Sequence, residues 1–291
     1  MAFESSAPPF LCAHRPRAHI VDALIAERAP KLAATAAWPL LRPMLYGLLD
    51  YAKARRMADA IAPLGGRAAL DFVAALLSVK VHARGLDRVP ARGRLIAVCN
   101  HPTGIADGVA VYEALKAARP ELMFYANSDA HRVAPRLSEV LIPVEWVEEK
   151  RTRERTRLTL SMTRETMEAE RALVVFPAGR LARKTPGGGA SDPPWASSAF
   201  SVARKYEADI LPMHLAGPWP ALFHFFHDFS TELRDMTLFH ELLNKRGKTF
   251  FLTIGHPVAP GALPLDAVEA AQAMRGYVER VLPADPDRRF A

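Results

Sequence analysis

The chain has 291 residues, of which half are apolar and 24% are charged, so it can bury the core of one large or two modest domains. Its formal net charge of +7 favours acidic partners: anionic lipid, nucleic acid, or phosphorylated and acyl-thioester substrates. Only Cys12 and Cys99 are present, which argues against a disulfide framework and favours a reducing, cytoplasmic setting. We expect neither a secretory signal nor a transmembrane span, because prolines and charges interrupt every apolar stretch of sufficient length.

Residues 1–80 are predicted to form an N-terminal helical segment. After a poorly ordered leader over 1–20, the pattern over 20–80 is helical and rich in Ala and Leu. An apolar run over 38–49 is flanked by Lys and Arg, which is typical of a helix lying at a membrane interface. A helix that packs on the core of the protein explains the same pattern equally well, so both interpretations stay open.

Residues 81–291 alternate between strand and helix patterns. Such alternation predicts an α/β fold with a mostly parallel central sheet flanked by helices. The densely charged helix predicted over 151–170 lacks interleaved aromatic residues and a reader motif, so we expect no nucleic-acid partner. Predicted strands occupy 94–99, 121–126, 139–147, 171–176, 208–214 and 249–255, and predicted helices occupy 107–119, 151–170 and 195–206.

The most informative stretch follows the first predicted strand of this sheet. Asn100 and His101 leave the strand and Asp107 enters the next helix, so a turn containing Thr103 and Gly104 can fold imidazole and carboxylate together. A His held by a carboxylate is a general base that can deprotonate a weakly acidic hydroxyl. Open α/β sheets place ligand sites at this edge, outside the carboxyl ends of the strands. A plain surface hydrogen bond between the two side chains is the competing interpretation.

A second block of candidates follows the predicted strand over 171–176. Its glycine lets the backbone pass close to a ligand, and the three cations that follow it suit a phosphate or another anion. This block lies at another strand end, hence at the same sheet edge as the His. The candidate substrate-binding residues of this block are Phe176, Pro177, Gly179, Arg180, Arg183 and Lys184, and those beside the His are Asn100, Thr103 and Gly104.

Two later stretches add weaker signals. Leu211-Pro212-Met213 is a strand with an internal proline, which predicts an edge or a bulge, and it either lines an apolar groove or is a plain core strand. Residues 222–229 are unusually aromatic, which is compatible with buried core, a wall for an acyl chain or a membrane contact.

Taken in order, Asn100-His101 with Asp107, the block Phe176-Pro-Ala-Gly179 and the strand around Pro212 resemble the glycerolipid acyltransferase superfamily of the lysophosphatidic acid acyltransferase type, over roughly 80–260. Members of this superfamily move fatty acyl groups from acyl-CoA or acyl carrier protein to a lysolipid hydroxyl in phospholipid and related lipid biosynthesis. The usual pattern has four residues between His and Asp, whereas this chain has five, and it has Ala178 and Leu181 where the usual pattern has Glu and Arg. These departures resemble the bacterial branch of hemolysin-like proteins and ornithine-lipid acyltransferases, which is also similar around Asp192 and Trp195 and over 241–248.

The resemblance implies that His101 deprotonates the acceptor hydroxyl and that Asp107 orients its ring. Backbone N–H groups near Gly104 are expected to stabilise the oxyanion, and Arg180, Arg183 and Lys184 are expected to hold an anionic headgroup or the donor's phosphates. No metal or cofactor is implied beyond the acyl donor, which is a substrate. The expected partners are a lysolipid acceptor, an acyl thioester donor and an anionic membrane, contacted peripherally on its cytoplasmic face.

Two alternatives belong to other functional classes. The missing Glu and Arg of the second block suit a catalytically weak or inactive membrane-binding protein of the same fold. A lipid or thioester hydrolase, with water as the acceptor, would use the same general base.

Overall fold

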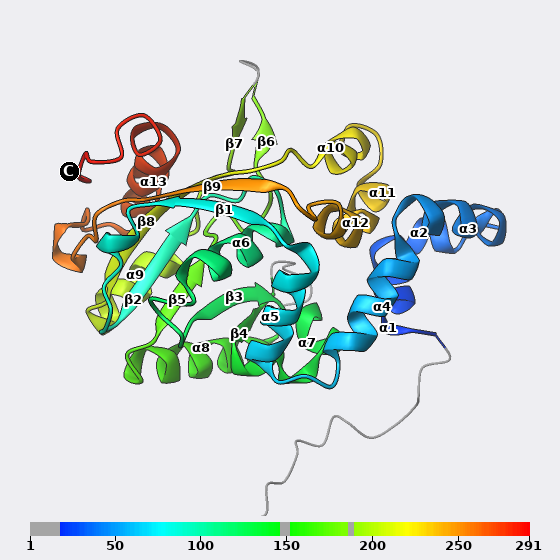
Figure 1. Ribbon diagram of the computed structural model, residues 1–291, viewed down its shortest axis with the longest axis horizontal. Helices are drawn as coiled ribbons and strands as arrows, with labels where there is room; N and C mark the ends of the chain where they lie inside the picture. The colour runs from blue at the N-terminus through cyan, green and yellow to red at the C-terminus, as the bar shows by residue number, and fades with distance from the viewer. Residues whose placement is uncertain (1–17, 146–151, 186–188) are drawn as a thin grey trace, which may run out of the picture.

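The computed structural model describes residues 18–145, 152–185 and 189–291. Over these ranges the chain forms a central sheet with helices on both faces, and the first helices of the chain gather at one end (Figure 1). The leader predicted over 1–20 lies outside the described residues except for 18–20, and the end of the strand predicted over 139–147 lies outside them as well.

In the described part of the chain, seven strands form the central sheet in the order β1-β9-β8-β2-β5-β3-β4. Neighbouring strands are parallel except for β8 and β9, which are antiparallel. The predicted α/β fold with a mostly parallel sheet flanked by helices is therefore confirmed. The strands are β1 (Lys80–Arg84), β2 (Leu95–Cys99), β3 (Met123–Asn127), β4 (Leu141–Val144), β5 (Ala172–Val175), β8 (Asp209–Ala216) and β9 (Thr249–Ile254), and β6 (Arg183–Lys184) pairs separately with β7 (Ala190–Ser191).

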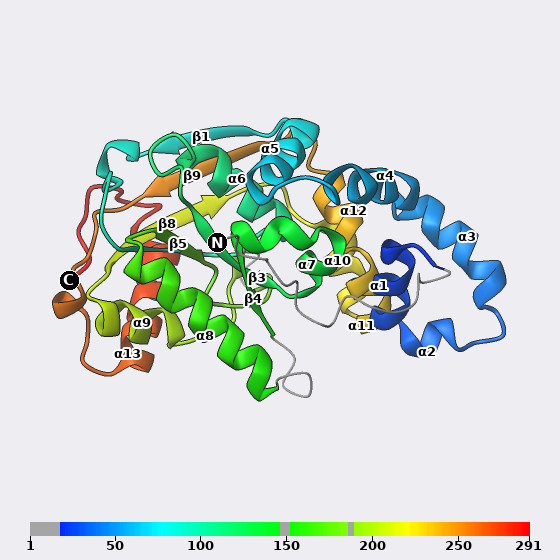
Figure 2. The same ribbon diagram turned by 90° about the horizontal axis from the view of Figure 1, so that it is seen from below.

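The residues of β2 show why both faces of the sheet are covered. Leu95, Ala97 and Cys99 join one apolar cluster, whereas Ile96 and Val98 join another, because successive side chains of a strand point to opposite faces. Every residue of β2 is buried, as expected for a continuous apolar run in a parallel sheet. Helices α5 (Gly66–Leu77) and α6 (Ile105–Leu115) cover the first cluster, and α8 (Arg153–Glu168), α9 (Ser198–Tyr206) and α13 (Ala267–Gly276) cover the second (Figure 2).

Each strand and helix predicted for this part of the chain coincides with an element, with ends shifted by a few residues. The edge strand β1 was not predicted. Its exposed residues Lys80, His82 and Arg84 alternate with only two apolar residues, which is too few for a clear strand pattern. The proline at position 212 was expected to mark an edge or a bulge. It marks no edge, because β8 lies inside the sheet between β2 and β9. The pairing does shift by one residue around it, since the step from Ile210 to Met213 opposes the longer step from Val258 to Ile254, as in a bulge. Pro212 is tolerated there because the ladder with β9 begins one residue later, at Met213. Shorter helical turns are α7 (Asp129–Val133), Pro135–Glu139, Pro260–Ala262 and Tyr277–Val281.

The N-terminal helices pack through one side and leave another exposed. Leu45 and Leu49 join the apolar cluster on the first face of the sheet. By contrast, Leu40, Met44 and Leu48 are 83%, 64% and 50% exposed. Residues 38–49 thus pack on the core through one side, and their contact with a membrane stays a prediction. These helices are α1 (Ile20–Arg28), α2 (Pro30–Ala33), α3 (Trp38–Leu48) and α4 (Tyr51–Ile61). Among the helices of the described ranges, none combines the length and the hydropathy that a bilayer span requires.

A buried ion pair holds the segment between β8 and β9 in place. Lys245 Nζ donates to Glu241 Oε2 at 2.9 Å, and both side chains are almost fully buried. Glu241 Oε1 also accepts the backbone N–H groups of Leu222 and Phe223 at 3.0 Å each. One carboxylate therefore fixes the start of α10 relative to α12. The helices of this segment are α10 (Ala221–His227), α11 (Thr231–Met236) and α12 (Leu238–Leu243).

We expect Lys245→Met to lower the free energy of unfolding by about 3–5 kcal/mol, because it leaves the carboxylate of Glu241 buried without its cation. Urea denaturation measures this change. Lys248→Met is the matched control, since the side chain of Lys248 is exposed and its loss should change stability by less than about 0.5 kcal/mol. Equal stabilities of the two variants would contradict the assigned role of the ion pair.

Candidate active site

His101 and Asp107 are in direct contact at the carboxyl end of β2. The distance from His101 Nδ1 to Asp107 Oδ2 is 2.9 Å. The carboxylate is fully buried, whereas the imidazole keeps 17% of its surface exposed. Because Nδ1 is bound to the carboxylate, Nε2 is the ring nitrogen left to exchange a proton with a bound substrate. The contact predicted from the sequence is therefore present.

Asp107 is held by the turn that precedes its helix. Its Oδ2 accepts the backbone N–H groups of Thr103 at 2.9 Å and Gly104 at 3.1 Å, and its Oδ1 accepts the hydroxyl of Thr103 at 2.5 Å. Gly104 has φ +102°, a conformation that a residue with a Cβ adopts only under strain. The expectation that N–H groups near Gly104 stabilise an oxyanion is wrong for Thr103 and Gly104, because both N–H groups already serve the carboxylate.

Cys99 and Asn100 lie at the end of β2, where they contact buried parts of the protein. The side-chain amide of Asn100 donates to the carbonyl of Leu215 at 2.9 Å and accepts its N–H at 2.7 Å, so it joins the end of β2 to β8. The amide oxygen and one of the two amide N–H groups of Asn100 are thus engaged with the backbone, and its role in substrate binding stays a prediction. Burial, followed by the charges of Asp107 and Asp192, raises the pKa of the Cys99 thiol well above its usual range. Cys99 therefore stays protonated and is a poor nucleophile.

Asp192 is a buried acid that contacts the site, and this contact was not predicted from the sequence. It accepts the backbone N–H of His101 at 3.1 Å and the indole N–H of Trp195 at 2.9 Å, and it is 2% exposed. Burial raises the pKa of its carboxyl to about 6. The pair Asp192 and Trp195 contributes to the family resemblance, but nothing in the sequence indicates that Asp192 lies against a residue 91 positions earlier.

The second block supports His101 from another side. The ring of Phe176 lies 4.7 Å from the imidazole, and the N–H of Ala182 donates to the carbonyl of His101 at 2.9 Å. Gly179 makes the turn between them, with φ +62° and its N–H donating to the carbonyl of Phe176. Pro177 is buried, and its carbonyl accepts a backbone N–H at 2.9 Å. This part of the block shapes the site through its backbone.

The three cations of the second block do not share one environment. Arg180 and Lys184 are exposed, whereas Arg183 is half-buried, with its guanidinium carbon 5.4 Å from the ring centre of Phe223 in α10. Arg183 thus contacts α10 through this aromatic ring. Leu181, which stands where the family has Arg, is buried beside Gly104.

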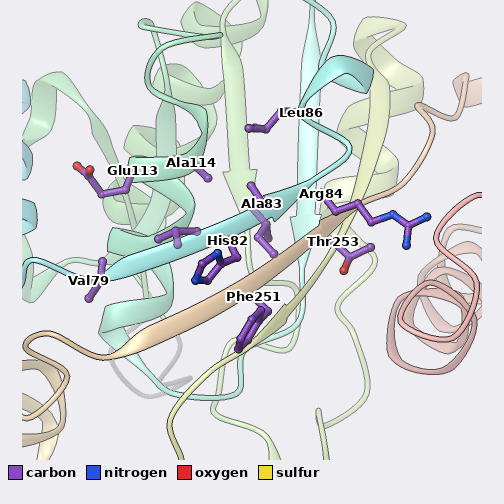
Figure 3. Close-up of a pocket in the computed structure, with 11 residues that line it drawn as sticks. Val79, His82, Ala83, Arg84, Leu86, Glu113, Ala114, Phe251 and Thr253 are labelled. Carbon is purple, nitrogen blue, oxygen red and sulfur yellow. The ribbon is translucent and has the colours of Figure 1, made fainter.

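The remaining sequence candidates lie in the core or elsewhere on the surface. Leu211 and Met213 are fully buried and pair with β2, as expected for a plain core strand. A separate hollow runs along the edge formed by β1 and β9, where His82 stacks on Phe251 at 5.3 Å (Figure 3). None of the residues discussed at His101 lines this hollow. Over the described ranges, no group of three or more His, Cys, Asp or Glu side chains is arranged to hold a metal ion.

The raised pKa of Asp192 predicts a specific pH dependence of stability. The folded protein binds this proton more tightly than the unfolded chain, so the contribution is fully present below the unfolded pKa and is lost as pH rises through about 6. Asn cannot titrate. The stability of wild type relative to Asp192→Asn should therefore fall by about 3 kcal/mol between about pH 4 and pH 7. Urea denaturation at a series of pH values tests this, and a pH-independent difference would contradict the assignment.

Comparisons with known proteins show which proteins this chain is similar to. Residues 80–216 match the family model described as Acyltransferase. A lyso-glycine lipid O-acyltransferase of Phocaeicola vulgatus is 28% identical over 202 residues, covering 65% of this chain and 69% of that protein. A lyso-glycine lipid O-acyltransferase of Bacteroides thetaiotaomicron is 24% identical over 198 residues, covering 65% and 71%.

Among solved structures, the 1-acyl-sn-glycerophosphate (LPA) acyltransferase PlsC of Thermotoga maritima aligns over 91% of this chain and 99% of its own, with 15% identity and a TM-score of 0.49. The matched region contains β1 to β8, and with them His101, Asp107 and the second block. These findings support the resemblance to the glycerolipid acyltransferase superfamily seen in the sequence, and they indicate that the protein is an acyltransferase.

Proposed function

We propose that the protein is an O-acyltransferase that moves a fatty acyl group from a thioester, acyl-CoA or acyl carrier protein, to the hydroxyl of a lysolipid. The names of its relatives support a lysolipid acceptor, and a glycine-bearing lysolipid is the first candidate. The observation that carries the proposal is the contact of His101 with the buried Asp107 at the carboxyl edge of the sheet.

In the proposed reaction, the Nε2 atom of His101 takes the proton of the acceptor hydroxyl as its oxygen attacks the thioester carbonyl. The new C–O bond gives a tetrahedral intermediate, which collapses by breaking the C–S bond. The thiolate leaves and takes the proton from the imidazolium, so the products are an ester and a free thiol. Asp107 keeps Nδ1 protonated and stabilises the imidazolium as it forms.

The proposal includes peripheral contact with an anionic membrane. On α3, the exposed Leu40, Met44 and Leu48 follow one another at intervals of four residues, so they lie on one face of the helix. Arg42 and Lys53 add positive charge nearby in the chain, which suits the cytoplasmic, anionic face of a membrane. A helix of this kind lies in the interface without crossing the bilayer.

We expect His101→Ala to lower kcat by roughly 10²–10⁴-fold, because the general base is lost. Asp107→Asn should also lower kcat strongly, since an amide nitrogen cannot accept the N–H groups that the buried carboxylate accepts. Purified protein with labelled acyl donor and lysolipid gives these rates. Cys99→Ala is the control and should retain wild-type turnover, because its thiol stays protonated. Full activity of His101→Ala would refute the assignment of the base.

The acceptor dependence of thiol release separates transfer from hydrolysis. Transfer predicts that free thiol appears only when the lysolipid is present and that a new ester lipid forms in equal amount, which mass spectrometry identifies. Release at the same rate without lysolipid would instead identify a hydrolase. An inert wild type that still binds vesicles would favour the inactive membrane-binding alternative.

The membrane contact predicts that Leu40→Glu combined with Met44→Glu weakens binding to vesicles of phosphatidylglycerol and phosphatidylcholine. Each apolar side chain buried in lipid contributes roughly 1.5–3 kcal/mol, so the loss should exceed about tenfold. Vesicle sedimentation measures the binding. Leu265→Glu is the matched control, because Leu265 is 94% exposed and lies far from α3 in the chain. Unchanged binding of the double variant would exclude this face of α3 as the contact.

A further inference from the structure

Asp192 is the centre of a hydrogen-bond network behind His101. Its Oδ1 atom accepts the backbone N–H of His101 at 3.1 Å, and its Oδ2 atom accepts the indole N–H of Trp195 at 2.9 Å. Its own backbone N–H donates to Oε1 of Glu279 at 2.5 Å, and Oε2 of Glu279 accepts the hydroxyl of Ser191 at 2.9 Å. The carboxylate of Asp192 is therefore held in one orientation, toward the turn that carries His101.

The segment that follows Asp192 is tied to the rest of the site. The N–H of Ala196 donates to the carbonyl of Pro177 in the second block at 2.9 Å, and the side-chain amide of Gln272 in α13 donates to the carbonyl of Trp195 at 2.8 Å. Residues 192–196 thus join the ends of β2 and β5 to α13. Asp192 is the member of this segment that contacts His101.

Asp192 has no Lys or Arg side chain as a direct partner in the described ranges. The hydrogen bonds that it accepts come from the N–H groups of His101 and Trp195. Arg275 donates to the hydroxyl of Ser191 at 2.8 Å, and its Nε atom lies 3.4 Å from Glu279, so its charge is directed to Glu279. A carboxylate that is 2% exposed and is not paired with a Lys or Arg is costly in its ionised form.

The hydrogen bonds of Asp192 do not require its charge. Burial raises the pKa of its carboxyl to about 6, so the group is mostly ionised at about pH 7 and above. Carboxyl and amide oxygens also accept N–H groups when they are neutral. Hydrogen bonding alone therefore does not explain why an ionisable acid occupies this buried position. The group on which the charge can act is the imidazole of His101.

The charges of Asp192 and His101 act on each other. A positive imidazole at His101 lowers the pKa of the Asp192 carboxyl. The interaction is reciprocal, because one free energy of attraction belongs to both groups, and an ionised Asp192 stabilises the imidazole when the ring carries a second proton. Asp107 does the same by direct contact at Nδ1, so the charges of two carboxylates act on one ring. Both carboxylates are buried, and water therefore screens their charges little.

We propose that Asp192 is a positioning residue of His101 and that its negative charge stabilises the imidazolium formed during acyl transfer. Its role in the reaction rests on the proposed function, whereas its action on the imidazole does not require turnover. Asp192 is too buried to touch a substrate, so it acts through His101. Loss of its charge should therefore slow the reaction and leave KM unchanged.

The other ionisable groups around Asp192 come from β2, α6 and the C-terminal helical segment. They are His101 and Cys99 at the end of β2, Asp107 in α6, Arg275 in α13 and Glu279 in the helical turn after it. Burial keeps the thiol of Cys99 protonated, because it raises its pKa well above the usual range. Since the carboxyl of Asp192 has a pKa of about 6, an effect of its charge should be present well above this pH and absent well below it.

The test removes the charge and keeps the hydrogen bond to His101. Asp192→Asn retains an oxygen that accepts the N–H of His101, but its NH2 group meets the indole N–H of Trp195, which is also a donor. Trp195→Phe takes away that second donor. The comparison is therefore between Trp195→Phe and the double variant Asp192→Asn with Trp195→Phe. If Trp195→Phe does not fold, Asp192→Asn is compared with wild type instead.

The protonation of the His101 ring is measured without turnover by histidine-selective nitrogen NMR, and the spectrum of His101→Ala assigns its signal. Without the charge of Asp192, the ring should take up its second proton at a pH about one unit lower. Single-turnover transfer of a labelled acyl group should be roughly tenfold slower at about pH 8. At about pH 5 the two rates should be equal, because position 192 is then neutral in both proteins.

Glu154→Gln is the matched control, because it removes an exposed carboxylate of α8 and should behave as wild type in both measurements. Two results would overturn the inference. One is a His101 ring that takes up its proton at the same pH with and without the charge. The other is a rate difference of the same size at both pH values, which a purely structural role of Asp192 predicts. Absence of transfer by wild type would overturn the proposed function, and the NMR comparison would still decide whether Asp192 acts on the imidazole.

Discussion

The site depends on one buried carboxylate. Asp107 is fully buried, and a buried ionised group is tolerated only when it is paired and hydrogen-bonded. The donors available to it are the backbone and hydroxyl of Thr103, the backbone of Gly104 and the ring of His101. The turn after β2 must therefore close around Asp107, and this closure requires the positive φ of Gly104. The orientation of the imidazole is a consequence of satisfying the carboxylate.

His101 is also fixed through its own backbone and the face of its ring. Its N–H is held by Asp192 and its carbonyl by Ala182, while the ring of Phe176 lies against the imidazole. These supports come from the end of β5 and from the segment that precedes α9. An imidazole held on three sides has little freedom to lose when a hydroxyl binds, so in the proposed reaction less binding energy would be needed to orient it.

The contacts that could be predicted from the sequence are those between residues close together in the chain. Central strands such as β2 were predictable because burial on both faces demands an unbroken apolar run. The contact of His101 with Asp107 was predictable because one short turn closes it. The contact of Asp192 with the same His joins residues 91 positions apart. The approach of Arg183 and Arg234 to the ring of Phe223 depends on how α10 and α11 pack. Such contacts follow from tertiary packing, which one sequence does not display.

The segment between β8 and β9 contains a buried ion pair and also contacts the second block. Its buried pair, Glu241 and Lys245, holds the backbone N–H of Phe223, and the guanidinium of Arg183 lies against the ring of Phe223. In the proposed reaction, a substrate whose anionic group was held by the cations of the second block would have its reacting end confined at this edge of the sheet. Binding energy from a part of the molecule that does not react is then used to orient the part that does. The absence of the family's usual Glu and Arg from the second block is compatible with the proposed function if another cation at the same edge of the sheet orients the substrate.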